Sequence, residues 1–193
     1  MTEADELPGG WRLGGIPGVL LRRMTIHPDP RGAFGEFWRA SWTDPLGSPG
    51  ERMVQANLSR SQPRVLRGLH AHRHQVDLWI VVEGHPWVAL VDLRPAIAGT
   101  GPVQTWTVAT EPGDSLYLPR GVAHGFYAPD QMTLMYLVSN VYDGSDELGF
   151  RWDDADAAIA WPDAQPILSD RDASAPSLQE LVTRWQALDR AAR

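Results

Sequence analysis

The chain has 193 residues, a formal charge of −7 at neutral pH and a pI near 5.3. This length fits one folded domain, and the acidic balance argues against a protein that binds nucleic acid through bulk charge. Cysteine is absent and all 17 basic residues are arginine, which excludes disulfides, zinc–thiolate sites and lysine Schiff bases.

The first residues of the chain are acidic, and no apolar run approaches the length that spans a membrane. We therefore expect a soluble cytoplasmic protein without a signal peptide, whose partner is neither nucleic acid nor a membrane.

Short strands dominate the predicted secondary structure. Residues 1–17 are rich in glycine and suggest an arm or loop, and residues 27–32 and 47–50 suggest a turn and a loop. Residues 33–42 fit a strand or a helix, and their aromatic side chains favour a strand. Further strands are predicted at residues 19–26, 53–60, 78–82, 86–92, 103–108, 115–118 and 133–141. Many short strands about ten residues apart are typical of a β-sandwich or barrel.

The C-terminal third differs in character. Residues 143–161 are acidic and irregular, whereas residues 177–190 carry apolar side chains at helical spacing behind a Ser177–Glu180 capping box. We predict one all-β domain over residues 1–193, with the segment 143–193 packing on the barrel.

Residues 53–60 alternate in an unusual way. Gln55, Asn57 and Ser59 share one strand face, and neutral hydrogen-bonding side chains in register suggest a face that lines a polar pocket. A face in contact with water remains the alternative.

Histidines and one acid gather around two segments. His70, His72 and Asp77 precede a strand-like apolar run, and His124 follows a Pro-x-Gly turn. Strand alternation places His70 and His72 on one face, and three imidazoles with a carboxylate suit divalent iron, nickel, manganese or zinc. Alternatively, these residues form a polar pocket without metal, or His72 and His74 are exposed.

Several motifs occur in a characteristic order. They include Asp-Pro-Arg-Gly-Ala-Phe-Gly-Glu at residues 29–36, Arg-Gly-Leu-His at 67–70, Leu-Pro-x-Gly-x-Ala-His-Gly-Phe at 118–126, and the segments 147–154 and 168–172. The two histidine segments resemble the paired signatures of the cupin superfamily, whose members are double-stranded β-helix (jelly-roll) barrels. Within it, residues 29–178 are similar to the dTDP-4-dehydrorhamnose 3,5-epimerase family.

This resemblance implies an isomerase of deoxysugar biosynthesis that needs no cofactor and no metal. It would invert C3, C5 or both, beside the C4 ketone of a dTDP-linked 4-keto-6-deoxyhexose, by removing and returning a proton. His70 matches the family's base, Asp172 the carboxylate that orients it, and Tyr136 the acid. The resemblance also implies a homodimer that exchanges N-terminal strands. The implied substrate-binding positions are Arg31, Phe34, Glu36, Gln55, Asn57, Arg67, His72, Asp77, His124, Tyr142, Glu147 and Arg171, with Arg151 in a matching motif.

One position departs from the family pattern. Asp77 stands where the epimerases usually carry a lysine, and a carboxylate there would oppose a developing enolate unless it is protonated, paired or bound to metal. Three alternatives follow: a dTDP-sugar 3,4-ketoisomerase, a sugar-nucleotide-binding barrel without activity, and a metal-dependent cupin. The metal ligands would then be His70, His72, Asp77 and His124.

Overall fold

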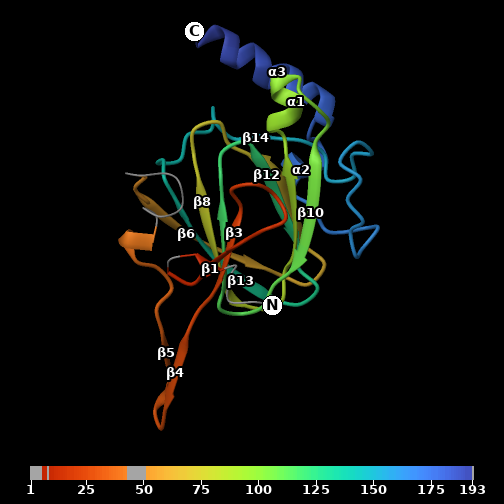
Figure 1. The fold of residues 1–193 in the computed structure, drawn as a ribbon. Coiled ribbons are helices and arrows are strands. Elements are labelled where there is room, and N and C mark those ends of the chain that lie inside the picture. Colours follow the sequence, from red (N-terminus) through yellow and green to blue (C-terminus); the bar gives the residue numbers. More distant parts are fainter. Residues whose placement is uncertain (1–5, 8, 43–50, 193) are drawn as a thin grey trace.

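The computed structural model describes residues 6–7, 9–42 and 51–192. Within these residues, antiparallel strands form two large sheets and one isolated hairpin (Figure 1). The prediction of an all-β protein is therefore confirmed. The predicted loop at residues 47–50 lies outside the described residues.

The first sheet has seven strands in the order β1-β2-β3-β11-β8-β13-β6. Five of the predicted strand segments belong to it, with boundaries shifted by a few residues. Its strands are β1 (Glu6–Leu7), β2 (Trp11–Leu13), β3 (Leu20–Arg23), β6 (Gln55–Ser61), β8 (Asp77–Glu83), β11 (Asp114–Leu118) and β13 (Met132–Val138).

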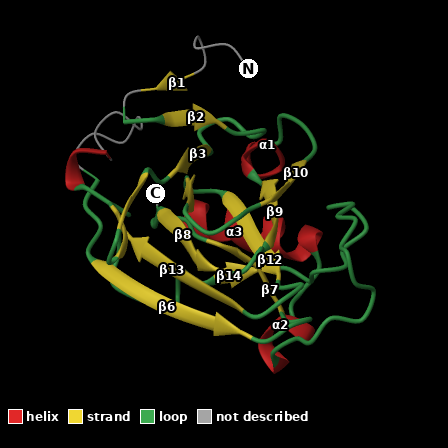
Figure 2. Cartoon of the chain, turned by 90° about the horizontal axis from the view of Figure 1, so that it is seen from below, coloured by secondary structure: helices red, strands yellow, loops and turns green. Residues whose placement is uncertain are grey.

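The second sheet has five strands in the order β10-β9-β12-β7-β14 and faces the first (Figure 2). Its strands are β7 (Leu66–Ala71), β9 (Trp87–Asp92), β10 (Gln104–Ala109), β12 (Val122–Tyr127) and β14 (Leu148–Gly149). Buried side chains from both sheets fill the space between them, for example Trp79, Leu116, Leu90 and Phe126. The rings of Trp79 and Phe126 pack edge to face, 5.8 Å apart. This core closes one end of the space between the sheets and leaves the other end for a cavity.

Two glycines let the central strands of the second sheet approach closely. Gly68 has a φ of +124°, and a Cβ placed on it would lie 2.6 Å from the Cα of Gly125. The register of β12 against β7 shifts at this point, between His124 and Phe126. His124 pairs directly with His70 across the two strands. The close approach therefore sets the positions of two histidines.

Helices cover one end of the barrel, near the C-terminus (Figure 1). The helix α3 (Leu178–Ala191) begins at Ser177 with the predicted capping box, and packs Leu181 and Trp185 against Leu69 and Val91. The short helix α1 (Arg94–Ala98) contacts α3, and α2 (Asp170–Ala173) contacts β7. None of the described helices is long and apolar enough to cross a membrane.

The N-terminal region corrects two expectations. Where residues 1–17 suggest an arm or loop, the described ones include β1 and β2, and Trp11 and Ile16 are buried. The segments expected as the turn 27–32 and the strand 33–42 form instead the hairpin β4 (Ile26–Asp29) and β5 (Gly32–Gly35), followed by a 3-10 turn at Ala40–Trp42. This hairpin projects away from the barrel (Figure 1). Because it packs on neither sheet, no burial periodicity marks it in the sequence.

Candidate active site

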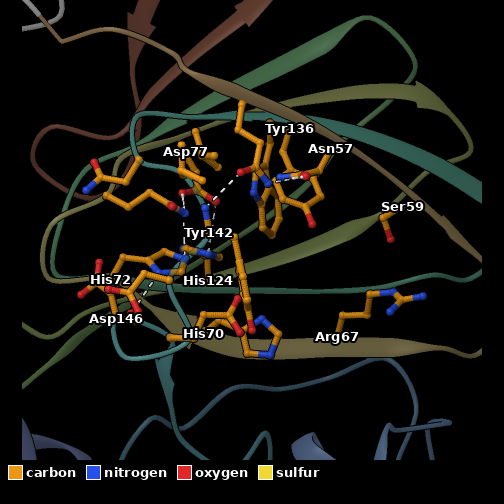
Figure 3. A pocket seen from close by; sticks show the side chains of 18 of the residues that line it. Asn57, Ser59, Arg67, His70, His72, Asp77, His124, Tyr136, Tyr142 and Asp146 are labelled. Atoms are coloured by element: carbon orange, nitrogen blue, oxygen red, sulfur yellow. Dashed lines mark hydrogen bonds and ion pairs between the residues drawn. The ribbon is translucent and has the colours of Figure 1, made fainter.

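A cavity of about 410 Å³ lies between the two sheets (Figure 3). Gln55, Asn57 and Ser59 line it, as the alternation of residues 53–60 predicts. The other predicted site residues that line it are Arg67, His70, His72, Asp77, His124, Tyr136, Tyr142, Glu147 and Arg171.

His70 and Asp172 form a hydrogen-bonded pair at the cavity wall. The Nε2 atom of His70 lies 2.8 Å from Oδ1 of Asp172, and the His70 side chain is 26% exposed. Because an ionised carboxylate only accepts, Nε2 carries the proton and Nδ1 keeps a free lone pair. This is the arrangement that a general base requires.

The helix α2 holds Asp172 behind His70. Ser169 caps α2 and accepts a hydrogen bond from the Asp172 backbone N–H at 3.1 Å. Burial by itself would raise the pKa of Asp172, but hydrogen bonds from His70, Ser169 and the Gly68 backbone outweigh it and lower that pKa below its usual value. Asp172 is therefore a carboxylate at neutral pH.

Tyr136 lies on β13, in the sheet that faces His70. It pairs with Asn57 of β6 on one side and with Trp79 of β8 on the other. Burial, and then the charges of Asp77 and Glu147, raise the pKa of Tyr136 above its usual value. The phenol therefore keeps its proton at neutral pH and is suited to act as an acid.

A second group of donors converges deeper in the cavity. His72 Nε2 lies 4.0 Å from Oδ1 of Asp77, and His124 Nε2 lies 3.8 Å from Oδ2 of the same carboxyl. All three side chains are buried. Among the described residues, they are the one group of three or more such donors that could hold a metal ion. His70, the fourth member of the predicted metal alternative, is not in this group.

Burial controls the protonation of this group. It raises the pKa of Asp77, opposed in part by His72 and by a hydrogen bond from Gln75. Burial also lowers the pKa of His124 well below its usual value, helped by repulsion from His72 and His70. The His124 imidazole is therefore neutral.

The polar rim of the cavity contains arginines and a carboxylate. Arg67 lies away from Asp77 in Figure 3 and donates through Nε to Ser61 Oγ at 3.0 Å. Arg171 forms an ion pair with Glu147. Arg151 instead pairs with Asp153. Arg67 and Arg171 thus bring two guanidinium groups to the cavity wall, and the charge of Arg171 is balanced by Glu147.

Three predicted substrate-binding residues lie outside this cavity. Arg31 and Phe34 are on the projecting hairpin, with the Arg31 side chain 90% exposed and Phe34 70% exposed. Glu36 follows β5 and pairs with Arg39. None of the three lines the cavity that contains His70.

The sequence did not indicate two residues that orient the site. The backbone carbonyl of Asp146 accepts a hydrogen bond from His72 Nδ1 at 3.2 Å, and its carboxylate accepts from the backbone N–H groups of Arg73 and His74. Gln75 donates to Asp77 Oδ1 at 2.8 Å. Both contacts depend on loop conformation, which no periodicity in the sequence reveals.

The dTDP-4-dehydrorhamnose 3,5-epimerase family model matches residues 14–180, a range that includes the whole cavity wall. The chain belongs to this family. It is therefore a carbohydrate epimerase, an isomerase, and the predictions of family, enzyme class and jelly-roll fold are confirmed.

Individual relatives agree with this membership. A dTDP-4-dehydrorhamnose 3-epimerase from Streptomyces niveus is 35% identical over 86% of this chain and 82% of its own length. A dTDP-4-dehydrorhamnose 3,5-epimerase from Mycobacterium tuberculosis is 33% identical over 91% of this chain and 93% of its own. The crystal structure of a dTDP-6-deoxy-D-glucose-3,5-epimerase from Legionella pneumophila, in complex with dTDP-4-keto-L-rhamnose, has a TM-score of 0.77. The two sequences are 31% identical, and the match covers 88% of this chain and 92% of the Legionella chain.

Proposed function

We propose that this epimerase inverts C3, C5 or both in a dTDP-linked 4-keto-6-deoxyhexose, with His70 as the base and Tyr136 as the acid. The Legionella relative was solved with a dTDP-4-keto sugar, which supports this substrate class. The Streptomyces niveus relative is named for one centre and the Mycobacterium tuberculosis relative for two. The solvent-exchange experiment below therefore also counts how many of the two carbons, C3 and C5, the enzyme inverts.

The observation that carries the proposal is the placement of His70 and Tyr136 on facing sheets. His70 extends from β7 and Tyr136 from β13, and both line the same cavity (Figure 3). A C4 ketone acidifies the protons on its neighbouring carbons. A base on one face removes such a proton, and an acid on the other face returns one, which inverts the carbon.

Asp172 acts as a positioning residue for His70. Its carboxylate fixes the tautomer with the proton on Nε2, so that the Nδ1 lone pair is available for the substrate. The negative charge of Asp172 also stabilises the imidazolium that forms when His70 takes a proton.

We propose further that the enzyme is a homodimer in which each hairpin β4–β5 reaches the cavity of the partner. The exposed Arg31 and Phe34 would then contact the diphosphate and the thymine, by charge-assisted hydrogen bonding and by stacking. Leu58 of the edge strand β6 and Val54, which directly precedes this strand, are 60% and 53% exposed. These apolar side chains support a subunit contact at this edge.

Solvent exchange tests the reaction. In deuterated water, the wild-type enzyme is expected to introduce deuterium at C3 or C5 of dTDP-4-keto-6-deoxyglucose, as followed by NMR. His70→Asn should bind dTDP normally and lose exchange by at least about a hundredfold. His85→Asn is the matched control, because His85 lies on the surface and pairs with Asp130. Unchanged exchange in the His70 variant would refute the base assignment.

A further inference from the structure

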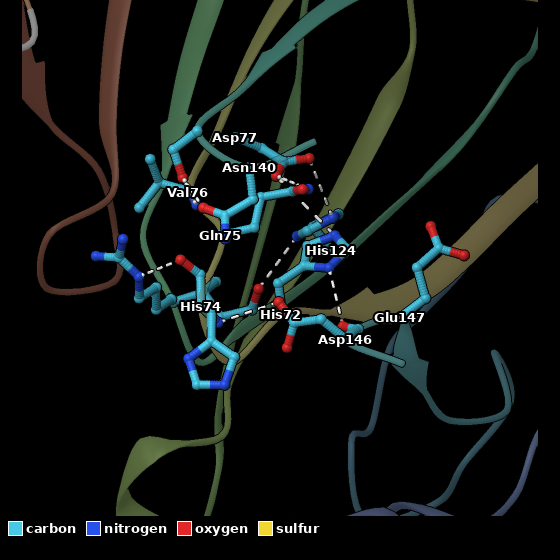
Figure 4. A network of polar contacts seen from close by, with 12 residues as sticks. His72, His74, Gln75, Val76, Asp77, His124, Asn140, Asp146 and Glu147 are labelled. Atoms are coloured by element: carbon cyan, nitrogen blue, oxygen red, sulfur yellow. Dashed lines mark hydrogen bonds and ion pairs between the residues drawn. The ribbon is translucent and has the colours of Figure 1, made fainter. Parts of the chain in front are cut away.

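Three hydrogen-bond acceptors converge deep in the cavity. The Nε2 atoms of His72 and His124 lie 4.0 and 3.8 Å from the oxygens of Asp77 (Figure 4). Both distances are too long for a direct hydrogen bond, so no proton bridges either pair. The three side chains line the cavity and are at most 9% exposed. The His72–Asp77–His124 cluster therefore surrounds a space that a polar ligand group can enter from the cavity.

The outer contacts of the histidines make both inner nitrogens acceptors. His72 Nδ1 donates to the carbonyl of Asp146 at 3.2 Å, and His124 Nδ1 donates to that of Val122 at 3.1 Å. Because a carbonyl oxygen can only accept, each Nδ1 carries the proton and each Nε2 keeps its lone pair on the side of Asp77. A group that satisfies the whole cluster must therefore supply three donors.

The spacing of the acceptors indicates which group this is. A protonated primary amine has three N–H donors, whereas a hydroxyl has one and a water molecule two. The acceptor atoms lie within 4.8 Å of one another, so a nitrogen at about 2.9 Å from all three fits without any movement of the side chains. A transition-metal ion, with donors at about 2.1 Å, needs them about 3.0–3.4 Å apart, and the separations of 3.8 and 4.0 Å are wider.

The charge of the cluster favours the same group. Asp77 accepts hydrogen bonds from neutral groups, the amide of Gln75 at 2.8 Å and the indole of Trp79. Within the part of the chain that the structure describes, the arginines that line the cavity have other partners: Arg67 donates to a serine, and Arg171 pairs with a glutamate. Burial of a carboxylate without a cation is costly. A cationic group on the ligand would offset this cost.

We propose that the His72–Asp77–His124 cluster binds a protonated primary amine on the sugar of the substrate. The substrate class is then an amino-substituted dTDP-4-keto-6-deoxyhexose, in which an ammonium group replaces the hydroxyl at C2 or C3. Asp77 determines specificity through its charge, and the two imidazoles direct the remaining N–H groups. The carboxylate of Asp146 holds the loop that carries His72 by accepting from two backbone N–H groups, so the cluster is oriented before the ligand arrives.

This inference rests on the proposed function and adds to its chemistry. Proton removal beside the C4 ketone places negative charge on the ketone oxygen, and the carboxylate of Asp77 would oppose that charge. An ammonium group bound to Asp77 offsets the charge of the carboxylate. The C4 ketone alone still acidifies the neighbouring protons, so the sugar without an amine remains a substrate, with weaker binding.

Calorimetry with matched ligands tests the cluster without turnover. We compare dTDP-6-deoxyglucose with its 2-amino and 3-amino analogues, which lack the ketone and cannot react. The wild-type protein should bind one of the two analogues at least about tenfold more tightly than dTDP-6-deoxyglucose. This preference should fall by at least about fivefold in Asp77→Asn and in His72→Phe. His85→Asn, at a surface histidine outside the cavity, should keep it. Thermal melting identifies a variant that fails to fold, and the other variant then provides the test.

The outcomes separate this inference from the proposed function. Equal affinities for all three ligands in the wild-type protein would overturn the amine site, and the proposed function would stand if dTDP-4-keto-6-deoxyglucose still exchanges hydrogen at C3 or C5. A preference that survives in both folded variants would overturn the assignment to this cluster. A preference that the variants lose, with no exchange in the 4-keto form of either the amino or the unsubstituted sugar, would refute the proposed function while supporting the amine site.

Discussion

His70 and Asp172 are 102 residues apart in the chain, yet His70 Nε2 lies 2.8 Å from Asp172 Oδ1. Two structural features bring them together. The close approach of Gly68 and Gly125 fixes the part of β7 that carries His70, and the Ser169 cap fixes α2 behind it.

Asp172→Asn should slow catalysis without weakening substrate binding. An asparagine can keep the contact to His70 but supplies no charge to stabilise the imidazolium, so kcat should fall by about ten- to a hundredfold while KM stays nearly constant. Steady-state kinetics on the dTDP-4-keto sugar provide the measurement. A rise in KM at constant kcat would instead place Asp172 in substrate binding.

The same substitution should change the stability of the fold in a pH-dependent way. The pKa of Asp172 is lowered in the folded protein, so its carboxylate stabilises the fold above the unfolded pKa of about 3.9, and this stabilisation is lost as the pH falls through the folded pKa. At pH 7, Asp172→Asn should cost about 1.5 kcal/mol. This corresponds to about 3–6 °C in Tm. The difference in Tm between the variant and the wild type should shrink below about pH 4. An equal difference at pH 7 and below pH 4 would mean that the charge of Asp172 does not stabilise the fold.

Tyr136→Phe should separate proton removal from inversion. His70 can still remove a proton, but no acid returns one from the opposite face, so deuterium should enter the substrate while inverted product falls by about a hundredfold. Because the pKa of Tyr136 is raised, the phenol keeps its proton up to about pH 10. The rate of inversion by the wild-type enzyme should therefore not fall below that pH through loss of this proton. NMR measures both the deuterium content of the substrate and the configuration of the product, and so distinguishes proton removal from inversion. Equal loss of exchange and inversion would assign Tyr136 a role in proton removal as well.

Mixed dimers test whether the hairpin acts on the partner. A variant with Arg31→Ala and a variant with His70→Asn should each be inactive or impaired alone. In a mixed dimer, one cavity would combine an intact His70 from one subunit with an intact Arg31 from the other. Activity should therefore recover when the two variants are unfolded and refolded together. No recovery, despite mixed dimers seen by native mass spectrometry, would mean that Arg31 serves its own chain or none.

Gly68→Ala should be far more destabilising than an ordinary glycine substitution. A Cβ at Gly68 would lie 2.6 Å from the Cα of Gly125 and 2.9 Å from the carbonyl oxygen of His124, at a φ of +124°. We expect a loss of at least about 3 kcal/mol in urea unfolding, from the forced separation of two strands. Gly99→Ala is the control. Its φ is also positive, at +70°, but nothing lies within 4 Å, so the cost should be about 1 kcal/mol. Equal costs at the two positions would contradict the close-packing argument.

Alternation and motif spacing revealed much of the barrel and of its cavity. Gln55, Asn57 and Ser59 were recognisable because every second residue of β6 points into the cavity. In contrast, all residues of β12 (Val122–Tyr127) are buried, so this strand has no alternation and was not predicted. The hairpin β4–β5 was missed for the opposite reason, because it buries almost nothing.

Spacing in the sequence did not predict how the side chains of the site are oriented. Spacing alone grouped His70 with His72, Asp77 and His124, whereas the family resemblance paired His70 with Asp172. The structure contains the His70–Asp172 contact and leaves the other three residues together. The strand ends at Ala71, so His72 lies beyond it in a loop, where alternation no longer determines direction. The carbonyl of Asp146 then decides the orientation of His72, and such a contact depends on tertiary packing alone.

The proposed reaction is tested most directly by following the C3 and C5 hydrogens of dTDP-4-keto-6-deoxyglucose in deuterated water with the wild-type enzyme. We expect NMR to show deuterium at one or both carbons, with inverted configuration where Tyr136 returns the proton, and we expect His70→Asn to abolish this exchange. Complete retention of hydrogen at both carbons, by folded enzyme that binds dTDP, would contradict the proposed reaction.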